Sequence, residues 1–240
     1  QGDKHLEDFT HVVLDEVHER DVQSDFLLML LRDLVQIRPD VRIILMSATL
    51  NARLFSDYFG GTPTLHIPGF THPVDEYYLD QIAPTLGPRS HWRAFPPTPR
   101  ERGIGEEVDV QLCEELVAYI INTTSSGAIL VFLTGWEDIT AMQKRLERRF
   151  KPTEAAIFPL HSDVPSQGQQ DVFQPMVDKR KVVLATNIAE SSITIDDVVY
   201  VIDAGKAKEK SYFASSRVSI LESRWISQAS ATQRKGRAGR

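Results

Sequence analysis

Apolar and polar residues follow one another along this chain in patterns that predict strands and helices in turn. Apolar runs at residues 10–14 and 41–46 are typical of buried strands. Between them lies a stretch with helical spacing, and we expect this helix to begin at Ser24 and to end near residue 37. Its apolar face is expected to hold Phe26, Leu27, Leu30, Leu31 and Leu34. The first part of the chain therefore predicts a strand, a helix and a second strand.

Turn residues mark the next elements. Asn51 is expected to cap a helix that ends at the pair Gly60 and Gly61. Short strands are then expected at residues 64–67 and 74–79.

The same alternation resumes after residue 108. Asp109 is expected to begin an amphipathic helix. Strands are predicted at residues 129–133, 156–160, 182–185 and 198–202, and helices at residues 136–150 and 166–177. Strands that alternate with helices imply a parallel sheet. Residues 206–213 and 218–223 are expected to form an antiparallel hairpin.

Composition changes between the two halves of the chain. Residues 84–105 contain five prolines and little periodicity, as linkers do. We therefore expect an α/β protein with two parallel-sheet lobes, residues 1–80 and residues 109–240, joined by a proline-rich linker over residues 81–108. The chain begins without methionine and stops inside an arginine-rich segment. We interpret it as a fragment whose first lobe is truncated at its N-terminus and whose second lobe is truncated after that segment.

Bulk composition narrows the class of protein. Hydrophobic residues make up 42% of the chain, which is enough for a sizeable core. The single cysteine, Cys113, excludes an internal disulfide and favours an intracellular setting. No apolar run reaches membrane-spanning length and no signal peptide is visible, so we expect no membrane association.

Charge is distributed unevenly. The net charge of −6 argues against binding to nucleic acid, but residues 204–240 carry a local balance of +7 and the rest of the chain carries −13. A basic segment on an acidic body can still bind a phosphate backbone. The alternative is a solvated basic face without a ligand.

Polar side chains follow most of the predicted strands. They are Asp15, Glu16, Ser47, Thr49, Ser162, Thr186 and Asp203. Ligands of open parallel sheets bind beyond the carboxyl ends of the strands, so this set predicts a site along that edge. Taken alone, Ser47 or Asp203 is better explained as a turn or capping residue. The ordered set favours a ligand site.

Asp15 and Glu16 have the chemistry of a nucleotide site. The carboxylate of Asp15 is suited to Mg²⁺, directly or through water, and Glu16 could orient or deprotonate an attacking water. His18 could instead be a zinc ligand, but no second His or Cys lies at ligand spacing nearby.

Two later segments are suited to phosphate. Residues 186–196 combine hydroxyl and amide side chains with aliphatic ones, and their backbone N–H groups could bind phosphates; the alternative is a capped loop with a short helix. Residues 233–240 place arginines at intervals of three among small residues, so several guanidinium groups could reach one polyanion.

These segments, in this order, resemble the conserved motifs of the DExH (DEAH-box) RNA helicases of superfamily 2. The matches are motif II at residues 15–18, motif III at 47–49, motif IV at 129–139, motif V at 186–196 and motif VI at 233–240. Residues 135–136 and 160–162 and the variant Lys235 resemble the RHAU/maleless branch, which includes members that resolve G-quadruplexes. Thr134 departs from the proline of many members of that branch.

The resemblance implies a role for each matching residue. Asp15 and Glu16 would be the Mg²⁺ and water-activating carboxylates, and Gln233, Arg237 and Arg240 would act at the γ-phosphate, the arginines as fingers. Phe173 would stack on adenine and Asp196 would contact the ribose. His18, Ser47 and Thr49 would couple hydrolysis to movement of the lobes. Ser162, Thr186 and Asn187 would touch the RNA backbone, and the hairpin after motif V would separate strands.

The resemblance also implies two RecA-like lobes, ATP and Mg²⁺ as cofactors, and RNA as partner, whether single-stranded, duplex or G-quadruplex. Ribonucleoprotein partners and a location in the cytoplasm or nucleus would fit that activity. The family's phosphate-binding loop, G-x-G-K-T, is absent from these residues. We therefore expect the chain alone to hydrolyse little ATP. The alternative is a nucleotide-independent RNA-binding or scaffold module, and a DNA or viral helicase is a third reading.

Overall fold

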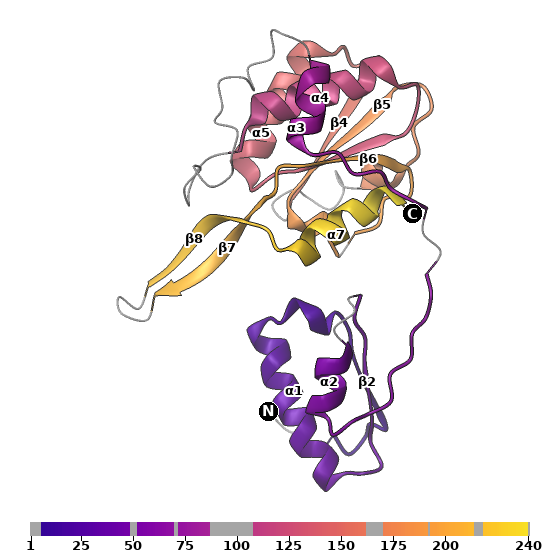
Figure 1. The fold of residues 1–240 in the computed structure, drawn as a ribbon, viewed down its shortest axis with the longest axis vertical. Helices are drawn as coiled ribbons and strands as arrows, with labels where there is room; N and C mark the ends of the chain where they lie inside the picture. The colour runs from indigo at the N-terminus through magenta and orange to yellow at the C-terminus, as the bar shows by residue number, and fades with distance from the viewer. Residues whose placement is uncertain are drawn as a thin grey trace. The chain divides into compact units, whose positions relative to one another are not determined.

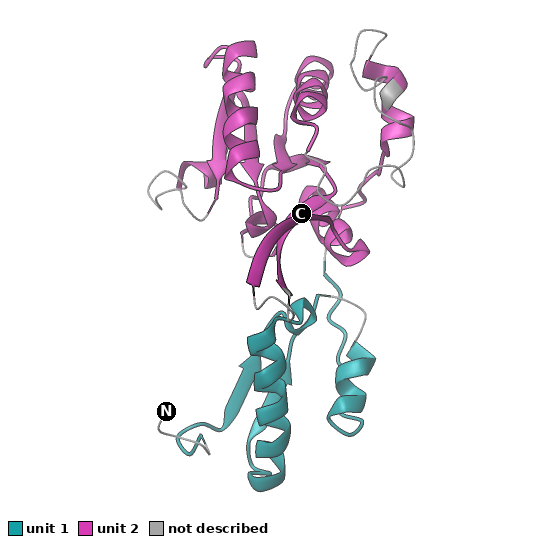
Figure 2. Ribbon diagram, turned by 90° about the vertical axis from the view of Figure 1, so that its left-hand side faces the viewer, with its two compact units in different colours: residues 1–69 teal, residues 70–240 magenta. Residues whose placement is uncertain are grey.

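The chain divides into two compact units. The computed structural model describes residues 6–48, 52–69, 72–86, 108–161, 170–191, 193–213 and 218–239. Unit 1 is residues 1–69 and unit 2 is residues 70–240 (Figure 2). The sequence placed this boundary near residue 80. Residues 72–86 belong to unit 2 instead, because the His72 N–H donates to the Gly239 carbonyl at 2.8 Å and Lys235 Nζ lies 2.7 Å from Glu76 Oε1.

Unit 1 is built on two parallel strands, β1 (His11–Leu14) and β2 (Arg42–Leu45), which pair with His11 opposite Arg42 (Figure 1). The chain between the strands forms a short 3-10 helix, η1 (Val17–Glu19), and then helix α1 (Val22–Ile37). Helix α2 (Ala52–Tyr58) follows β2. A small core joins these elements around Val17, Leu28 and Phe55.

Helix α1 differs from its prediction in two respects. It begins before Ser24 because the Asp21 carboxylate caps it, accepting the N–H groups of Gln23 at 2.8 Å and Ser24 at 3.0 Å. Its buried residues are Leu28, Leu31 and Leu34, whereas Phe26, Leu27 and Leu30 are 60%, 37% and 64% exposed. Residues 26–31 are apolar at every position, so their spacing could not identify the buried face.

The strands predicted at residues 64–67 and 74–79 are wrong. In the described part of these segments no strand pairing occurs, and Leu65 and Ile67 are 83% and 78% exposed. A strand needs a neighbour for its backbone N–H and C=O groups, and β1 and β2 pair with each other. Residues 79–82 form a short helix, α3 (Leu79–Ile82), followed by η2 (Ala83–Leu86). The predicted cap Asn51 and most of the predicted linker lie outside the described residues.

Unit 2 contains a four-stranded parallel sheet in the order β4-β5-β3-β6. The strands are β3 (Ala128–Phe132), β4 (Ala155–Leu160), β5 (Arg180–Ala185) and β6 (Val198–Asp203). Each agrees with a predicted strand to within about two residues. The parallel pairing confirms the α/β class. Every residue of the two central strands, β3 and β5, is buried, which explains why β3 and residues 182–185 of β5 read as apolar runs.

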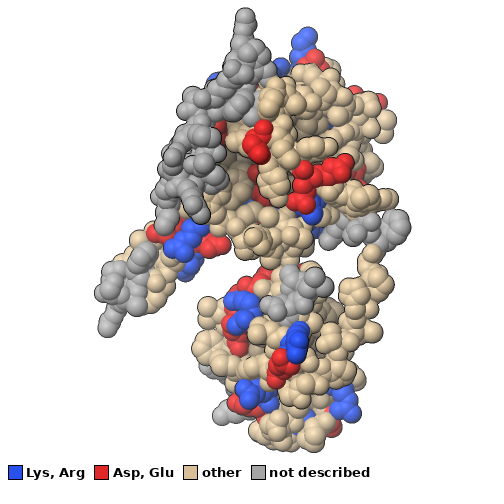
Figure 3. Space-filling view, viewed as in Figure 1, with Lys and Arg blue, Asp and Glu red and all other residues tan. Residues whose placement is uncertain are grey.

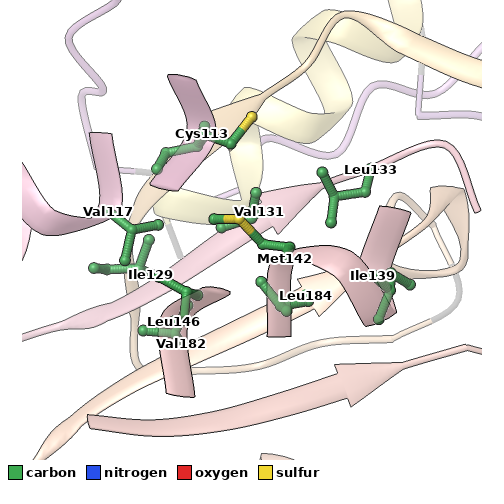
Figure 4. Close-up of a cluster of buried hydrophobic side chains, with 11 residues drawn as sticks. Cys113, Val117, Ile129, Val131, Leu133, Ile139, Met142, Leu146, Val182 and Leu184 are labelled. Atoms are coloured by element: carbon green, nitrogen blue, oxygen red, sulfur yellow. The ribbon is translucent and has the colours of Figure 1, made fainter. Parts of the chain in front are cut away.

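Helices α4 (Val110–Thr123) and α5 (Trp136–Arg149) pack on one face of this sheet (Figures 1 and 4). Asp109 caps α4 as predicted, accepting the Leu112 N–H at 2.9 Å. The core on this face includes Cys113, and burial raises the pKa of its thiol to about 12. A second apolar cluster on the other face includes Val172, Ala189 and Ile195.

The chain enters β3 through a tight turn at Gly127. Its φ is +93°, and a Cβ atom there would lie 2.6 Å from Cβ of Val199, so a side chain is excluded on two counts.

Beyond the sheet, β7 (Lys206–Phe213) and β8 (Val218–Trp225) form the predicted antiparallel hairpin. The chain ends in helix α7 (Gln228–Gly236) and η7 (Arg237–Gly239). The helix predicted at residues 166–177 is shorter: η5 (Gln170–Phe173) is its described part, residues 174–177 are not helical, and residues 166–169 lie outside the described residues.

Candidate functional site

In unit 1, the predicted acidic and hydroxyl residues meet at the carboxyl ends of β1 and β2. The Met46 N–H donates to the Leu14 carbonyl at 2.8 Å, and the Val17 N–H donates to the Met46 carbonyl at 3.1 Å. These two bonds continue the parallel pairing past the ends of the strands. Asp15 and Glu16 are thereby held beside the segment that contains Ser47.

The backbone at Glu16 is in the left-handed region, with φ of +53°. For a residue with a side chain this conformation is uncommon and costs energy, and it is often found at functional sites. Asp15 stabilises the turn because its Oδ1 accepts the Glu16 N–H at 2.8 Å. Asp15 itself is exposed, and the Glu16 side chain is 40% exposed. Both carboxylates therefore remain accessible at the edge of the sheet.

His18 connects the two segments of unit 1. Its side chain is 8% exposed, and its Nδ1 lies 3.4 Å from Oε2 of Glu16 and accepts the Ala48 N–H at 3.4 Å. One nitrogen cannot accept from Ala48 and donate to Glu16 at once, so only one of the two hydrogen bonds is made at a time. His18 thus links the carboxylate at 16 to the segment at 47–49.

Asp15 fits Mg²⁺ bound to a nucleotide better than a metal held by protein alone. Among the described residues, no group of three or more His, Cys, Asp or Glu side chains is placed to hold a metal ion. Mg²⁺ commonly binds one or two carboxylates together with phosphates and waters, and an exposed Asp15 provides one such oxygen ligand.

In unit 2, Thr186 and Asn187 follow β5 at the carboxyl edge of the four-stranded sheet. Asn187 begins a short 3-10 helix, η6 (Asn187–Ala189), as the alternative reading of this segment expected. Thr186 is buried and its side chain makes no capping hydrogen bond, whereas Asn187 is exposed. The exposed amide is the more accessible of the two predicted RNA contacts.

Arg234 is fully buried in unit 2. Its Nε lies 2.9 Å from Oε2 of Glu190 and its Nη1 lies 2.8 Å from Oδ1 of Asp203. The guanidinium also stacks on the ring of Phe132, 4.7 Å from its centroid. Two carboxylates and an aromatic face therefore hold this arginine, and it joins α7 to the ends of β3 and β6 and to residue 190.

Arg237 is also directed into unit 2. Its Nη1 donates to the carbonyl of Ile193 at 3.0 Å and its Nη2 donates to the carbonyl of Glu190. The residue is 6% exposed. The segment at residues 186–196 and the segment at residues 233–240 are therefore joined by two arginines, one through a side chain and one through backbone carbonyls. Gln233, on the same helix, is half-buried.

Among the described residues of the segment 204–240, four basic side chains form ion pairs. Besides Arg234, the pairs are Lys208 with Glu137 at 3.7 Å, Arg224 with Glu222 at 2.9 Å and Lys235 with Glu76 at 2.7 Å. Lys206 is 4% exposed and lies over the ring of Trp225 at 4.8 Å. Basic and acidic side chains lie next to each other on the hairpin face shown in Figure 3. In the described part of this segment, basic side chains do not form the continuous basic surface that its composition suggested.

Phe173 and Asp196 lie on two other connections of unit 2. Phe173 ends η5 and is 48% exposed, and Asp196 is exposed just before β6. The buried Lys181 links their neighbours: its Nζ donates to the Val172 carbonyl and to Oδ1 of Asp197, both at 2.8 Å. Sequence reasoning missed Lys181 and Glu190, and it expected Arg234 to face a polyanion, whereas Arg234 is paired with Glu190 and Asp203. The signal for Lys181 was a charged residue at the start of a run that is otherwise apolar.

Three predicted site residues, Thr49, Ser162 and Arg240, lie outside the described residues. Within the described part of the chain, no helix combines the length and the apolar character needed to cross a membrane.

Comparison with known proteins identifies the family. Residues 110–240 match the helicase conserved C-terminal domain. The chain is 43% identical to the DExH-box ATP-dependent RNA helicase DExH1 of Arabidopsis thaliana, over 99% of this chain and 28% of that protein. It is 45% identical to the ATP-dependent RNA helicase DHX30 of Gallus gallus, over 100% of this chain and 20% of that protein. It is 41% identical to the ATP-dependent DNA/RNA helicase DHX36 of Bos taurus, over 100% and 28%.

The chain thus spans between a fifth and three tenths of the length of these relatives. The domain match covers more than half of the chain and includes both arginine-linked segments of unit 2. The chain therefore belongs to the DExH/DEAH-box helicases and contains their conserved C-terminal helicase domain.

Proposed function

We propose that this chain is part of an ATP-dependent RNA helicase. It would contribute residues from both units to the binding of nucleotide and RNA. The observation that carries the proposal is the bonding of Arg234 and Arg237 to residues 190 and 193. These bonds connect residues 233–240, which hold the predicted phosphate-binding arginines, to residues 186–196, which hold predicted RNA contacts. The names of the relatives, ATP-dependent helicases acting on RNA or on DNA and RNA, support the same activity.

Each predicted residue has a role in this proposal. Glu16 orients and deprotonates the attacking water, and its strained backbone fixes the direction of the carboxylate. Gln233, Arg237 and Arg240 serve the γ-phosphate, and Phe173 and Asp196 contact the nucleoside. His18, Ser47 and Thr49 couple hydrolysis to movement of the lobes. Ser162, Thr186 and Asn187 hold the RNA backbone, so sequence preference is low.

The proposed cofactors are ATP and Mg²⁺. Mg²⁺, when bound at Asp15, supplies positive charge that offsets the charge developing on the phosphates. The proposed partner is RNA, as single strand, duplex or G-quadruplex, with ribonucleoprotein partners and an intracellular location in cytoplasm or nucleus. A nucleotide-independent RNA-binding module is the competing function, and the absence of a G-x-G-K-[ST] loop from these residues favours it for the chain taken alone.

The test uses the complete helicase, meaning this chain together with the upstream phosphate-binding loop that the family carries. Glu16→Gln should lower kcat for RNA-stimulated ATP hydrolysis roughly 10²–10⁴-fold, as expected for loss of a general base, and should leave RNA affinity unchanged. The matched control is Glu19→Gln, which removes the same charge from an exposed residue of η1. Turnover is measured by phosphate release, and RNA affinity by fluorescence anisotropy.

The 240-residue chain is measured in parallel and should show no RNA-stimulated turnover. An unchanged kcat in Glu16→Gln would refute the role of Glu16. RNA binding without turnover by the complete, unsubstituted protein would instead establish the binding module. Comparison of RNA and DNA duplexes as unwinding substrates separates an RNA helicase from a DNA helicase.

A further inference from the structure

Lys181 is a buried cation at the start of β5 in unit 2. Its side chain is 1% exposed, and its ammonium donates to the Val172 carbonyl and to Oδ1 of Asp197, both at 2.8 Å. Asp197 is 30% exposed, so the pair is buried on the lysine side and reaches solvent on the aspartate side. The ammonium thus connects η5 (Gln170–Phe173) with the turn before β6.

The two partners of Lys181 are each one residue away from a predicted nucleoside contact. Val172 precedes Phe173, and Asp197 follows Asp196. Val172 is itself fully buried, so its carbonyl is fixed, while the adjacent Phe173 is 48% exposed and directed away from the core. Phe173 and Asp196 are far apart in the sequence and lie on different connections of the sheet. Lys181 holds both connections through one ammonium group.

Stability alone is a poor explanation for a lysine at this position. Removing a charged group from water is costly, and an apolar side chain of similar volume often serves a core as well or better. The adjacent Arg180 shows what a purely architectural cation does here. It donates to the carbonyls of Gly127 at 2.7 Å and Thr124 at 2.6 Å, which lie in the connection from α4 to β3. Its contacts do not touch the connections that carry Phe173 and Asp196.

We propose that Lys181 is a positioning residue for the nucleoside, because it fixes the spacing between the adenine-stacking Phe173 and the ribose-contacting Asp196. This inference rests on the proposed function, which assigns those two contacts. Lys181 does not touch the nucleotide. It acts through the backbone of Val172 and the side chain of Asp197, and so it affects nucleotide binding rather than the chemical step.

The experiment compares steady-state ATP hydrolysis by variants of the complete helicase. Lys181→Met keeps the length of the side chain without its charge and should raise KM for ATP roughly three- to tenfold, as expected for the loss of one or two hydrogen bonds. The kcat value should hardly change, because the residues at the γ-phosphate are untouched. Lys181→Arg should restore part of the affinity. The matched control, Arg180→Met, should destabilise the protein and leave KM unchanged.

Phe173→Ala separates this inference from the proposed function. If Phe173→Ala leaves KM for ATP unchanged, the nucleoside site itself is misassigned and the proposed roles fail with it. If Phe173→Ala raises KM and Lys181→Met does not, only the positioning role is overturned.

A double substitution tests whether Lys181 acts through Phe173. In the Phe173→Ala background, Lys181→Met should raise KM much less than in the parent protein, because the stacking that it positions is already lost. A fully additive effect would overturn the inference. Should Lys181→Met fail to fold, Asp197→Asn removes the charge of one partner at a part-exposed position and should raise KM in the same direction.

Discussion

At the scale of single residues, close contact decides which side chains this protein accepts. Gly239 lies in η7, and a Cβ atom at this position would be 2.7 Å from the carbonyl oxygen of His72 and 2.9 Å from Cγ2 of Val74. The His72 N–H donates to the Gly239 carbonyl at 2.8 Å, so the two backbones approach closely from both directions. The absence of a side chain at 239 is what allows residues 72–74 to lie along the end of the helicase domain.

We therefore expect Gly239→Ala to lower the free energy of unfolding of unit 2 by about 1–3 kcal/mol, as other overpacked sites do. Gly236→Ala is the control, because nothing lies within 4 Å of the Cβ position at 236. Urea denaturation followed by tryptophan fluorescence measures both. Equal stabilities for the two variants would show that residues 72–74 do not constrain position 239.

The sequence predicted where the polar site residues lie in the fold, but it did not predict which side chains they contact. Asp15, Glu16 and Ser47 were expected at strand ends because parallel strands finish at one edge, and the structure places them there. The buried role of Arg234 could not be predicted in this way. It depends on Glu190 and Asp203, which approach it only after the sheet has formed, and no local pattern encodes such long-range pairs.

At the scale of elements, helix α1 depends on the Asp21 cap. The Ser24 hydroxyl and the backbone N–H groups of Ser24 and Gln23 donate to this carboxylate and hold its pKa below the ordinary value of 3.8. A depressed pKa means that the charged form stabilises the folded state. This contribution is complete above about pH 4 and is lost as the pH falls through the folded-state pKa.

We expect unit 1 to lose stability as acid protonates Asp21, and Asp21→Asn to reduce that pH dependence while retaining a cap. Urea denaturation at stepped pH, followed by far-UV circular dichroism, measures the difference. The nearby Asp25 also has a pKa lowered by its hydrogen bond with Arg20, and it is common to both proteins. Identical pH profiles for the two proteins would contradict a titrating cap.

Strands were predicted well where a partner strand is available, whether they are buried throughout, as β3 is, or half-exposed, as β1 and β2 are. β3 is buried at every residue, and a continuous apolar run bounded by turns leaves little choice. The segment at 64–67 alternates polar and apolar residues, as half-buried strands do, but no neighbouring strand pairs with it among the described residues. Pairing is a tertiary property, so the sequence of the segment alone could not exclude a strand there.

At the scale of the whole molecule, the two units differ in how much core they contain. Unit 2 has apolar clusters on both faces of a four-stranded sheet. Unit 1 has one small cluster, and its two strands pair only with each other in the part that the structure describes. Helix α1 also exposes Val22, Phe26, Leu30 and Ile37 by 60–72%. A two-stranded sheet with this little buried surface has low intrinsic stability.

Hydrogen exchange should therefore show that unit 1 opens more readily than unit 2 in the 240-residue chain. We expect the amides of β1 and β2 to exchange well before those of β3 and β5, as measured by mass spectrometry after pepsin digestion. The comparison is internal, since both pairs are parallel strands of the same polypeptide. Simultaneous exchange of the two units would mean that they unfold as a single cooperative body.

The bonds of Arg237 have a thermodynamic consequence. The N–H groups of Arg237 that donate to the carbonyls of residues 190 and 193 are not available to a phosphate at the same time. Phosphate binding and the ordering of residues 190–193 then compete for one group. Such linkage is reciprocal: whatever tightens that segment on Arg237 weakens the grip on phosphate by the same factor, and phosphate loosens the segment in return. In the proposed function, a single side chain thus passes the state of the nucleotide to the segment that follows the proposed RNA contacts, without any change in the sheet beneath it.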